Sequence, residues 1–287
     1  MSRWKRALNI LLADPALFAR VLPAKLRGLF PVPKGPVRKP VCGVIFEFDF
    51  ALGPSVKSMY CGFFEYETCA AMRRLLRPGD TFLDVGASIG YLTAVGAGLV
   101  GPSGQVHSFE PVPEHFQRLR ALAAANAEFR IVTSNCALGE TEGEATICVP
   151  KAANIGWNTM VPGFMPAESR ARSLTVPVHR LDAYVREQGL NSISLVKIDV
   201  EGFEFPVLKG FAEYLRIAER KPAIICEVAP AAYPLLGCVP TDLARYMADF
   251  GYTIRSLCNP RREVDLAALT ETTNVLFLPA EVKRRPA

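Results

Sequence analysis

A glycine-containing turn and an acid that follows it could together bind a nucleoside. The turn, Asp84-Val85-Gly86-Ala87-Ser88-Ile89-Gly90, closes the apolar run 81–85. Gly86 and Gly90 remove side chains where the backbone must bend sharply and where a ligand would approach it. Their Gly-x-x-x-Gly spacing lacks the third glycine of the sites that cradle a pyrophosphate. Glu110 ends the next apolar run, where a carboxylate can accept hydrogen bonds from both ribose hydroxyls. The pair predicts an adenosine-containing ligand that carries no pyrophosphate.

Acids at the ends of two later apolar runs could activate an oxygen nucleophile. Asp199 ends the run 194–200, with Glu201 and Glu204 just beyond it, and Glu227 ends the run 223–228. We expect these two runs to be adjacent strands, which would bring Asp199 and Glu227 together. A carboxylate there could take the proton of a hydroxyl. Three of them could also hold Mg²⁺ or another divalent cation, an alternative that we do not favour. Glu204 fits equally well as an acid that stabilises a helix N-terminus.

Short apolar strands alternate with helical stretches around these residues. This pattern predicts an α/β domain over residues 41–287, with a mostly parallel sheet and helices on both faces. The expected strands are 41–50, 81–85, 105–109, 129–133, 194–200, 223–228, 252–257 and 274–278, and the expected helices are 63–77, 89–99, 113–126, 205–215 and 241–250.

The stretch 151–172 interrupts this alternation and could form a lid over the site. Trp157 in it offers a platform for stacking a sugar ring, although a loop with no role is nearly as good an interpretation. Among the histidines, His115 is expected on an exposed helix surface, whereas His179 could approach the pocket.

The first 40 residues differ from the rest of the chain in charge. They hold nine Lys or Arg against one acid, Asp14, so this segment carries +8 and the remaining residues sum to −3. An acidic body argues against a general nucleic-acid-binding surface. The segment mixes apolar and basic residues and ends in a proline-rich linker, which predicts an amphipathic helical extension. It would pack on the body or on a second subunit, as in a homodimer, or make a peripheral membrane contact through residues 1–30.

The cysteines and the apolar runs limit where the protein works. Eight cysteines are scattered without a Cys-x-x-Cys pair, several of them inside apolar runs, which favours reduced thiols and a cytoplasmic location. No uncharged apolar run is long enough to cross a membrane.

The strings that carry these residues resemble the FkbM family of class I S-adenosylmethionine (SAM)-dependent methyltransferases. The resemblance covers about residues 60–280, and Lys197-Ile198-Asp199-Val200-Glu201-Gly202-Phe203-Glu204 is its most specific part. Ser88 stands where the family usually has Asn. Other matching strings are 82–91, 109–113, 135–139, 180–182 and 224–228, together with Tyr66-Glu67.

This resemblance implies a Rossmann-like sheet of seven strands and the transfer of a methyl group from SAM to a hydroxyl of a sugar, a glycolipid or a natural product. It implies that SAM is bound along the turn from Asp84 to Gly90. It further implies cofactor contacts at Gly86, Ala87, Ser88, Gly90 and Glu110, and an adenine edged by Asn135, Cys136 and Ala137. The predicted catalytic residues are Asp199, Glu201 and Glu227.

Three other functions share parts of this pattern. A nicotinamide dehydrogenase would need a different glycine spacing. A nucleic-acid methyltransferase would usually carry an Asn/Asp-Pro-Pro-aromatic string where this chain has Ile198-Asp199-Val200-Glu201-Gly202. A non-catalytic SAM-fold binding module remains the alternative to an enzyme.

Overall fold

The computed structural model describes residues 22–26, 28, 31–151 and 156–280. Most of the predicted N-terminal extension therefore lies outside the described residues. Of that extension, residues 22–26 are helical, and Lys25 Nζ lies 5.8 Å from the ring centre of Tyr66. The described part of the chain contains no helix long and apolar enough to cross a membrane.

A hairpin comes before the central sheet in the chain and packs on the domain. Its strands are β1 (Val37–Val41) and β2 (Val44–Phe48), which pair antiparallel. The hairpin thus starts ahead of the domain boundary that we expected after residue 40. Alternation in β2 sends Val44, Phe46 and Phe48 into the core and leaves the residues between them exposed.

Seven strands form the central sheet in the order β11-β12-β10-β9-β3-β4-β5. Six of the seven strands run in one direction and only β12 runs in the opposite one, so the prediction of a mostly parallel sheet is confirmed. The strands are β3 (Thr81–Val85), β4 (Gln105–Phe109), β5 (Ile131–Ser134), β9 (Leu195–Ile198), β10 (Ala223–Val228), β11 (Tyr252–Ser256) and β12 (Thr273–Pro279).

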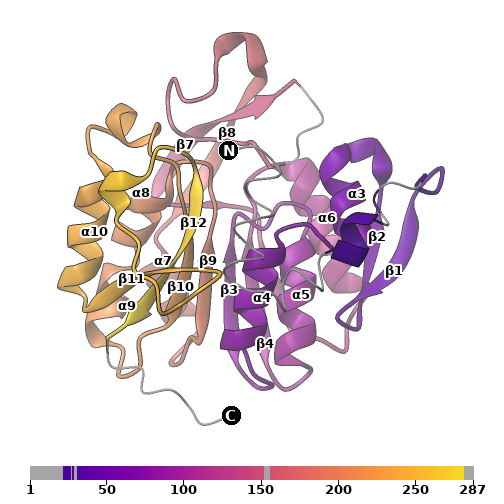
Figure 1. Ribbon diagram of the computed structural model, residues 1–287, viewed down its shortest axis with the longest axis horizontal. Helices are drawn as coiled ribbons and strands as arrows, with labels where there is room; N and C mark the ends of the chain where they lie inside the picture. The colour runs from indigo at the N-terminus through magenta and orange to yellow at the C-terminus, as the bar shows by residue number, and fades with distance from the viewer. Residues whose placement is uncertain (1–21, 27, 29–30, 152–155, 281–287) are drawn as a thin grey trace.

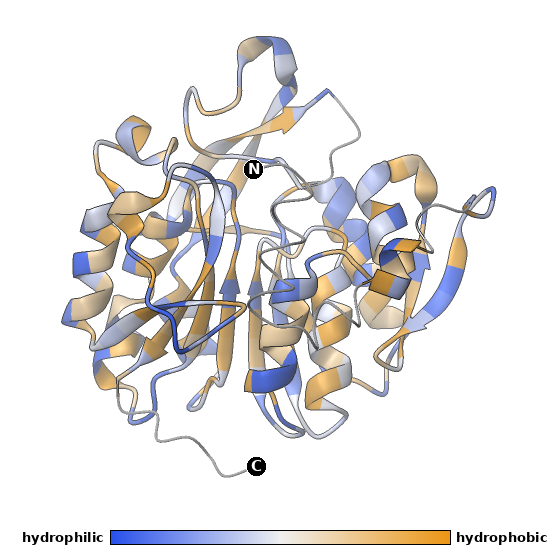
Figure 2. Cartoon of the chain, viewed as in Figure 1, coloured by the Kyte–Doolittle hydropathy of each residue, from blue (hydrophilic) through white to orange (hydrophobic). Residues whose placement is uncertain are grey.

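Helices cover both faces of this sheet, as predicted (Figure 1). Successive residues of β3 show why: Phe82 packs in the core on one face, and Leu83 packs in the core on the other. One face is covered by α3 (Pro54–Cys61), α4 (Tyr66–Leu75), α5 (Tyr91–Val100) and α6 (Pro113–Ala124), and the other by α7 (Leu181–Glu187), α8 (Glu204–Lys209), α9 (Ala212–Ile217) and α10 (Pro240–Asp249). Figure 2 shows apolar residues along the strands between these two layers.

One prediction about a helix needs correction. The helix expected over 205–215 is divided at Gly210 into α8 and α9, and a side chain at Gly210 would overlap the backbone oxygen of Gly139. A second sheet lies within residues 137–179. It consists of β6 (Ala137–Leu138), β7 (Gly143–Pro150) and β8 (Arg170–His179), and β7 and β8 project at the top of the view in Figure 1. Short 3-10 turns lie at Phe50–Leu52, Ala167–Ser169, Tyr233–Leu236 and Leu266–Ala268.

The strand order places the site. The chain passes from β3 outward through β4 to β5, and then returns to β9 on the other side of β3. The connections after β3 and β9 therefore diverge, and ligands of such sheets bind in the crevice that this divergence opens at the carboxyl ends of the strands.

Candidate active site

The turn after β3 is shaped by contact with the end of β9. Gly86 has φ +78°, and a Cβ built on it would overlap the backbone oxygen of Asp199. The N–H groups of Gly86 and Ala87 both donate to Phe109 O, which ties the turn to the end of β4 (3.1 and 2.9 Å). Ser88 follows in a left-handed conformation, with φ +51°, which non-glycine residues adopt at a cost. The glycine at position 86 is thus required by the backbone of β9 as well as by the turn.

Glu110 closes the same wall from the end of β4. Its two carboxylate oxygens accept backbone N–H groups, one from Ser88 at 2.8 Å and one from Val112 at 2.9 Å. Burial raises the pKa of Glu110 to about 7, although these two N–H groups oppose the shift. Each carboxylate oxygen has a second lone-pair direction, so a ribose hydroxyl could still donate to it.

A cavity of about 240 Å³ lies between this wall and the ends of β9 and β10. Six of the nine predicted cofactor residues line it, namely Gly86, Ala87, Ser88, Glu110, Cys136 and Ala137, and so do all three predicted catalytic acids, Asp199, Glu201 and Glu227.

Asp84, Gly90 and Asn135, the other three predicted cofactor residues, are not among the residues that line the cavity. Asp84 is fully buried behind the turn and accepts a hydrogen bond from Thr93 Oγ1 at 2.7 Å. Gly90 is the N-cap of α5, where a side chain would press on α6. The Asn135 amide donates to the backbone oxygens of Glu110 and Pro111, at 2.8 and 3.1 Å. These residues support the wall from behind.

Lys197 joins the two sides of the cavity. Its Nζ donates to Gly86 O at 3.0 Å and lies 3.3 Å from Asp199 Oδ2 and 3.7 Å from Asp84 Oδ1. Burial opposes its charge, but the two carboxylates outweigh burial, so the pKa of the Lys197 ammonium is raised. Lys197 thus has two carboxylate partners, one on each side of the cavity wall.

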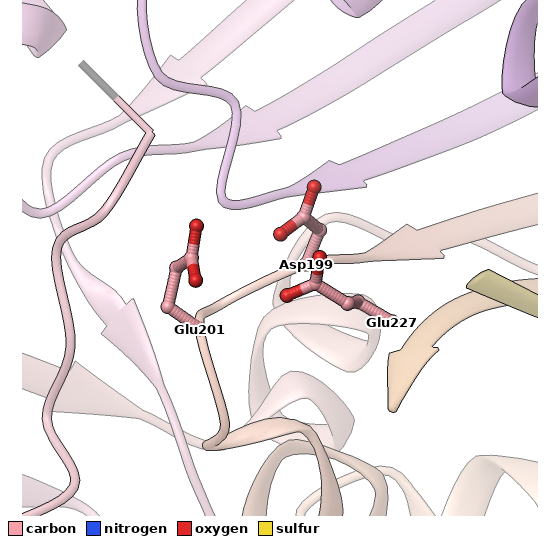
Figure 3. A group of neighbouring side chains, drawn as sticks. All are labelled: Asp199, Glu201 and Glu227. Atoms are coloured by element: carbon pink, nitrogen blue, oxygen red, sulfur yellow. The ribbon is translucent and has the colours of Figure 1, made fainter. Parts of the chain in front are cut away.

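Asp199, Glu201 and Glu227 converge on the opposite wall (Figure 3). The prediction that β9 and β10 are adjacent is confirmed: they pair in parallel with Ile198 beside Cys226, so the acids that follow lie together. One oxygen from each acid lies within 4.8 Å of the others, a spacing that carboxylate ligands of a divalent cation could adopt with small adjustments.

Burial dominates the acid–base behaviour of this cluster. Burial, with the charge of Asp199 adding to it, raises the pKa of Glu201 to about 8. The same two causes raise the pKa of Glu227 well above its usual range. Among the described residues, Glu227 Oε2 has no hydrogen-bond partner. Without a bound ion, the cluster therefore holds protons at neutral pH.

Glu204 has a structural position. It is fully buried, and its Oε1 accepts the N–H groups of Val200 and Gly202 at 3.1 and 2.9 Å. It thereby fixes the turn that carries Glu201, whose φ of +53° is left-handed. Of the two roles that the sequence allowed, the structure supports the stabilising one.

Sequence reasoning missed several residues around the cavity. Glu65 lines it from the N-cap of α4, with φ +47°. Asn158 and Met160 line it from the stretch that we expected to be a lid, whereas Trp157 is not among the lining residues. The sequence around Glu65 and Met160 does not predict that they line the cavity, since tertiary packing brings each of them to the site.

The structure changes the view of two histidines. His115 was expected to be exposed, but its side chain is only 13% exposed and lies 3.8 Å from Glu110 Oε1. The sequence left open an approach of His179 to the pocket. Instead its side chain is about half exposed and pairs with Glu142 Oε2 at 2.8 Å, and it is absent from the cavity lining.

Known methyltransferases resemble this chain in sequence. The family model described as the Methyltransferase FkbM domain matches residues 84–254. A 31-O-demethyl-FK506 methyltransferase FkbM of Streptomyces tacrolimicus is 34% identical over 170 residues, which are 50% of this chain and 65% of the relative. The methyltransferase sdnD of Sordaria araneosa is 32% identical over 164 residues, 47% of this chain and 62% of the relative.

A crystal structure of a methyltransferase FkbM from Methylobacillus flagellatus KT is 16% identical, with a TM-score of 0.44 over 91% of this chain and 60% of that one. The chain thus spans less than two thirds of each of these three proteins. The family model alone covers more than half of the chain, from the turn after β3 to β11. The resemblance noted in the sequence is therefore confirmed, and the chain belongs to the FkbM methyltransferase family.

Proposed function

We propose that this protein binds SAM in the cavity and transfers its methyl group to the hydroxyl of a small-molecule acceptor. The observation that carries the proposal is the pairing of two unlike walls. One wall holds a glycine turn with Glu110 behind it, which suits a nucleoside. The other holds three carboxylates, which suit the activation of a hydroxyl.

Each wall has its own part in binding. Glu110 would accept hydrogen bonds from the ribose hydroxyls, and Gly86, Ala87 and Ser88 would lie against the cofactor. Cys136 and Ala137 would edge the adenine. The sulfonium methyl would then face the acids across the cavity, and the acceptor oxygen would enter between them.

Methyl transfer is an in-line displacement, so alignment of oxygen, carbon and sulfur supplies much of the rate. The methyl group leaves the sulfur and bonds to the acceptor oxygen, while the proton of that oxygen passes to a carboxylate. The products are a methyl ether, S-adenosylhomocysteine and a protonated acid. Glu201 suits the role of base: with a pKa of about 8, its ionised form is the minor one at neutral pH, but that form accepts a proton more readily than an ordinary glutamate.

The neighbours of Glu201 would assist it. Asp199, paired with Lys197, adds the negative charge that helps to raise the pKa of Glu201. Burial and the charge of Asp199 raise the pKa of Glu227 and so favour its protonated form, which can donate a hydrogen bond to substrate. A divalent cation on the same three acids could activate the hydroxyl instead. We favour the base, since Lys197 and a protonated Glu227 already offset the charge of the acids.

A hydroxyl of a sugar, a glycolipid or a natural product is the acceptor class that we propose. One relative supports a small-molecule hydroxyl as acceptor, since its name describes a methyltransferase that acts on 31-O-demethyl-FK506. A screen with isotope-labelled SAM against extracts, followed by mass spectrometry of the product, would identify the acceptor.

Calorimetry tests whether the protein binds SAM and S-adenosylhomocysteine at all. The full chain should bind both SAM and S-adenosylhomocysteine, and Gly86→Asp and Glu110→Ala should each weaken both. No binding of either ligand by the wild-type protein would refute the proposal.

Turnover then separates an enzyme from a non-catalytic SAM-binding module. Asp199→Asn and Glu201→Gln should lose methyl transfer to the acceptor found in the screen while keeping affinity for S-adenosylhomocysteine. Asp249→Asn, at the exposed end of α10, is the matched control and should keep both properties. Full turnover in Asp199→Asn and Glu201→Gln would remove these acids from the mechanism.

A further inference from the structure

One polar side chain interrupts an otherwise apolar part of the cavity wall. Ala137, Ile147 and Met160 pack together in one small core beneath the β7–β8 sheet, and all three line the cavity. Asn158 lines it beside them, and its Oδ1 is buried without a hydrogen-bond partner among the described residues. A buried amide oxygen without a donor destabilises the protein, so a donor from a ligand would be favoured there.

His115 holds the nitrogen end of the Asn158 amide. The Asn158 Nδ2 lies 3.3 Å from His115 Nδ1. Burial lowers the pKa of His115 to about 4, with Glu114 opposing the shift, so the ring is neutral at physiological pH. A neutral ring can accept the amide N–H at Nδ1, and the amide oxygen is then left to the ligand.

Thr159, the residue after Asn158, is held by β7 on one side and by the backbone of Glu201 on the other. Thr159 exchanges two backbone hydrogen bonds with Cys148 of β7, at 2.8 and 3.2 Å. Its Oγ1 donates to Glu201 O at 2.7 Å. The segment therefore bridges the Ala137 side of the cavity and the acid cluster, which makes the position of Asn158 a fixed part of the site.

We propose that Asn158 is a specificity-determining residue that reads the amino group of adenine, with His115 as its positioning residue. The inference rests on the proposed function, which puts adenine against Cys136 and Ala137. Adenine has apolar faces that suit Ile147 and Met160, and its exocyclic amino group is a hydrogen-bond donor that suits Asn158 Oδ1. A base with a carbonyl at the same position would place two acceptors face to face.

Binding of two matched nucleosides tests this inference. S-inosylhomocysteine differs from S-adenosylhomocysteine in carrying a carbonyl in place of the amino group. By calorimetry, the wild-type full chain should bind S-adenosylhomocysteine on the order of 100-fold more tightly, because the carbonyl leaves Asn158 unpaired. Asn158→Ala should bind S-adenosylhomocysteine about 10-fold more weakly than wild type and bring the preference close to one.

A second variant separates positioning from structure. His115→Phe frees the amide to rotate, so the preference for adenine should fall while affinity for S-adenosylhomocysteine changes little. Thr175→Ala, an exposed residue of β8, is the control and should keep both values. If Asn158→Ala keeps the wild-type preference, this inference is wrong and the proposed function stands. If the wild-type protein binds neither nucleoside, the proposed function itself fails.

Discussion

Replacing Gly86 by alanine should destabilise the protein through two separable effects. The first is conformational, because φ is +78° at this residue and an L side chain in the left-handed region costs about 1–2 kcal/mol. The second is steric, because the new Cβ would overlap the backbone oxygen of Asp199. Overpacking of this kind typically costs about 1–3 kcal/mol, and a backbone oxygen cannot rotate away as a side chain can. The expected loss in free energy of unfolding is therefore about 2–5 kcal/mol.

Gly251 supplies a matched control for the conformational effect. Its φ is +77°, and a Cβ there would have no atom within 4 Å. Gly251→Ala should therefore cost about 1–2 kcal/mol, the conformational part alone. Urea unfolding of the wild-type chain and both variants measures the difference, which we assign to the contact between the ends of β3 and β9. Equal destabilisation by the two substitutions would refute this reasoning.

Three further predictions concern charge in the cavity. Because burial raises the pKa of Glu110 to about 7, this carboxyl gains a proton as pH falls below 7, and affinity for S-adenosylhomocysteine measured by calorimetry should fall with it. Glu110→Gln should bind weakly at every pH, and a wild-type affinity that is flat from pH 8 to 5.5 would contradict the assignment. Lys197→Met should cost about 3–5 kcal/mol in urea unfolding, since it leaves buried Asp84 uncompensated, whereas Lys209→Met on the surface should cost less than about 1 kcal/mol. Methyl transfer should survive dialysis against a chelator, and loss of turnover that Mg²⁺ restores would show that a cation activates the hydroxyl.

Features of the site that depend on regular strands could be predicted from the sequence. Parallel strands end at the same edge of a sheet, so acids at the ends of two adjacent strands must meet. This argument placed Asp199 beside Glu227, and the pairing of β9 with β10 bears it out. The same argument put Glu110 beside the turn at Gly86, and Ser88 N donates to its carboxylate.

Features that depend on packing between distant segments could not be predicted. His115 was expected at an exposed helix surface. This expectation failed because the sequence of a helix does not show which distant segment covers its first turn. The segment that carries Asn158 covers it, and Arg172 of β8 reaches Glu114 beside it at 2.7 Å. Gly210 is another case: the backbone of Gly139, distant in sequence, lies so close that a side chain at position 210 would overlap it.

The turn and the acid cluster form one mechanical and electrostatic unit. Lys197 contacts Gly86 O and Asp199 with the same ammonium group, and the Gly86 backbone touches the backbone of Asp199 directly. A shift of either wall must therefore move the other, or break the buried contacts of Lys197. In the proposed function these contacts would set the distance between the sulfur of bound SAM and the base, and in-line transfer is sensitive to that distance. Substitutions at Lys197 should consequently lower turnover more than they lower affinity for S-adenosylhomocysteine. Binding depends on the wall formed by the glycine turn and Glu110, whereas methyl transfer also depends on the position of the acids relative to that wall.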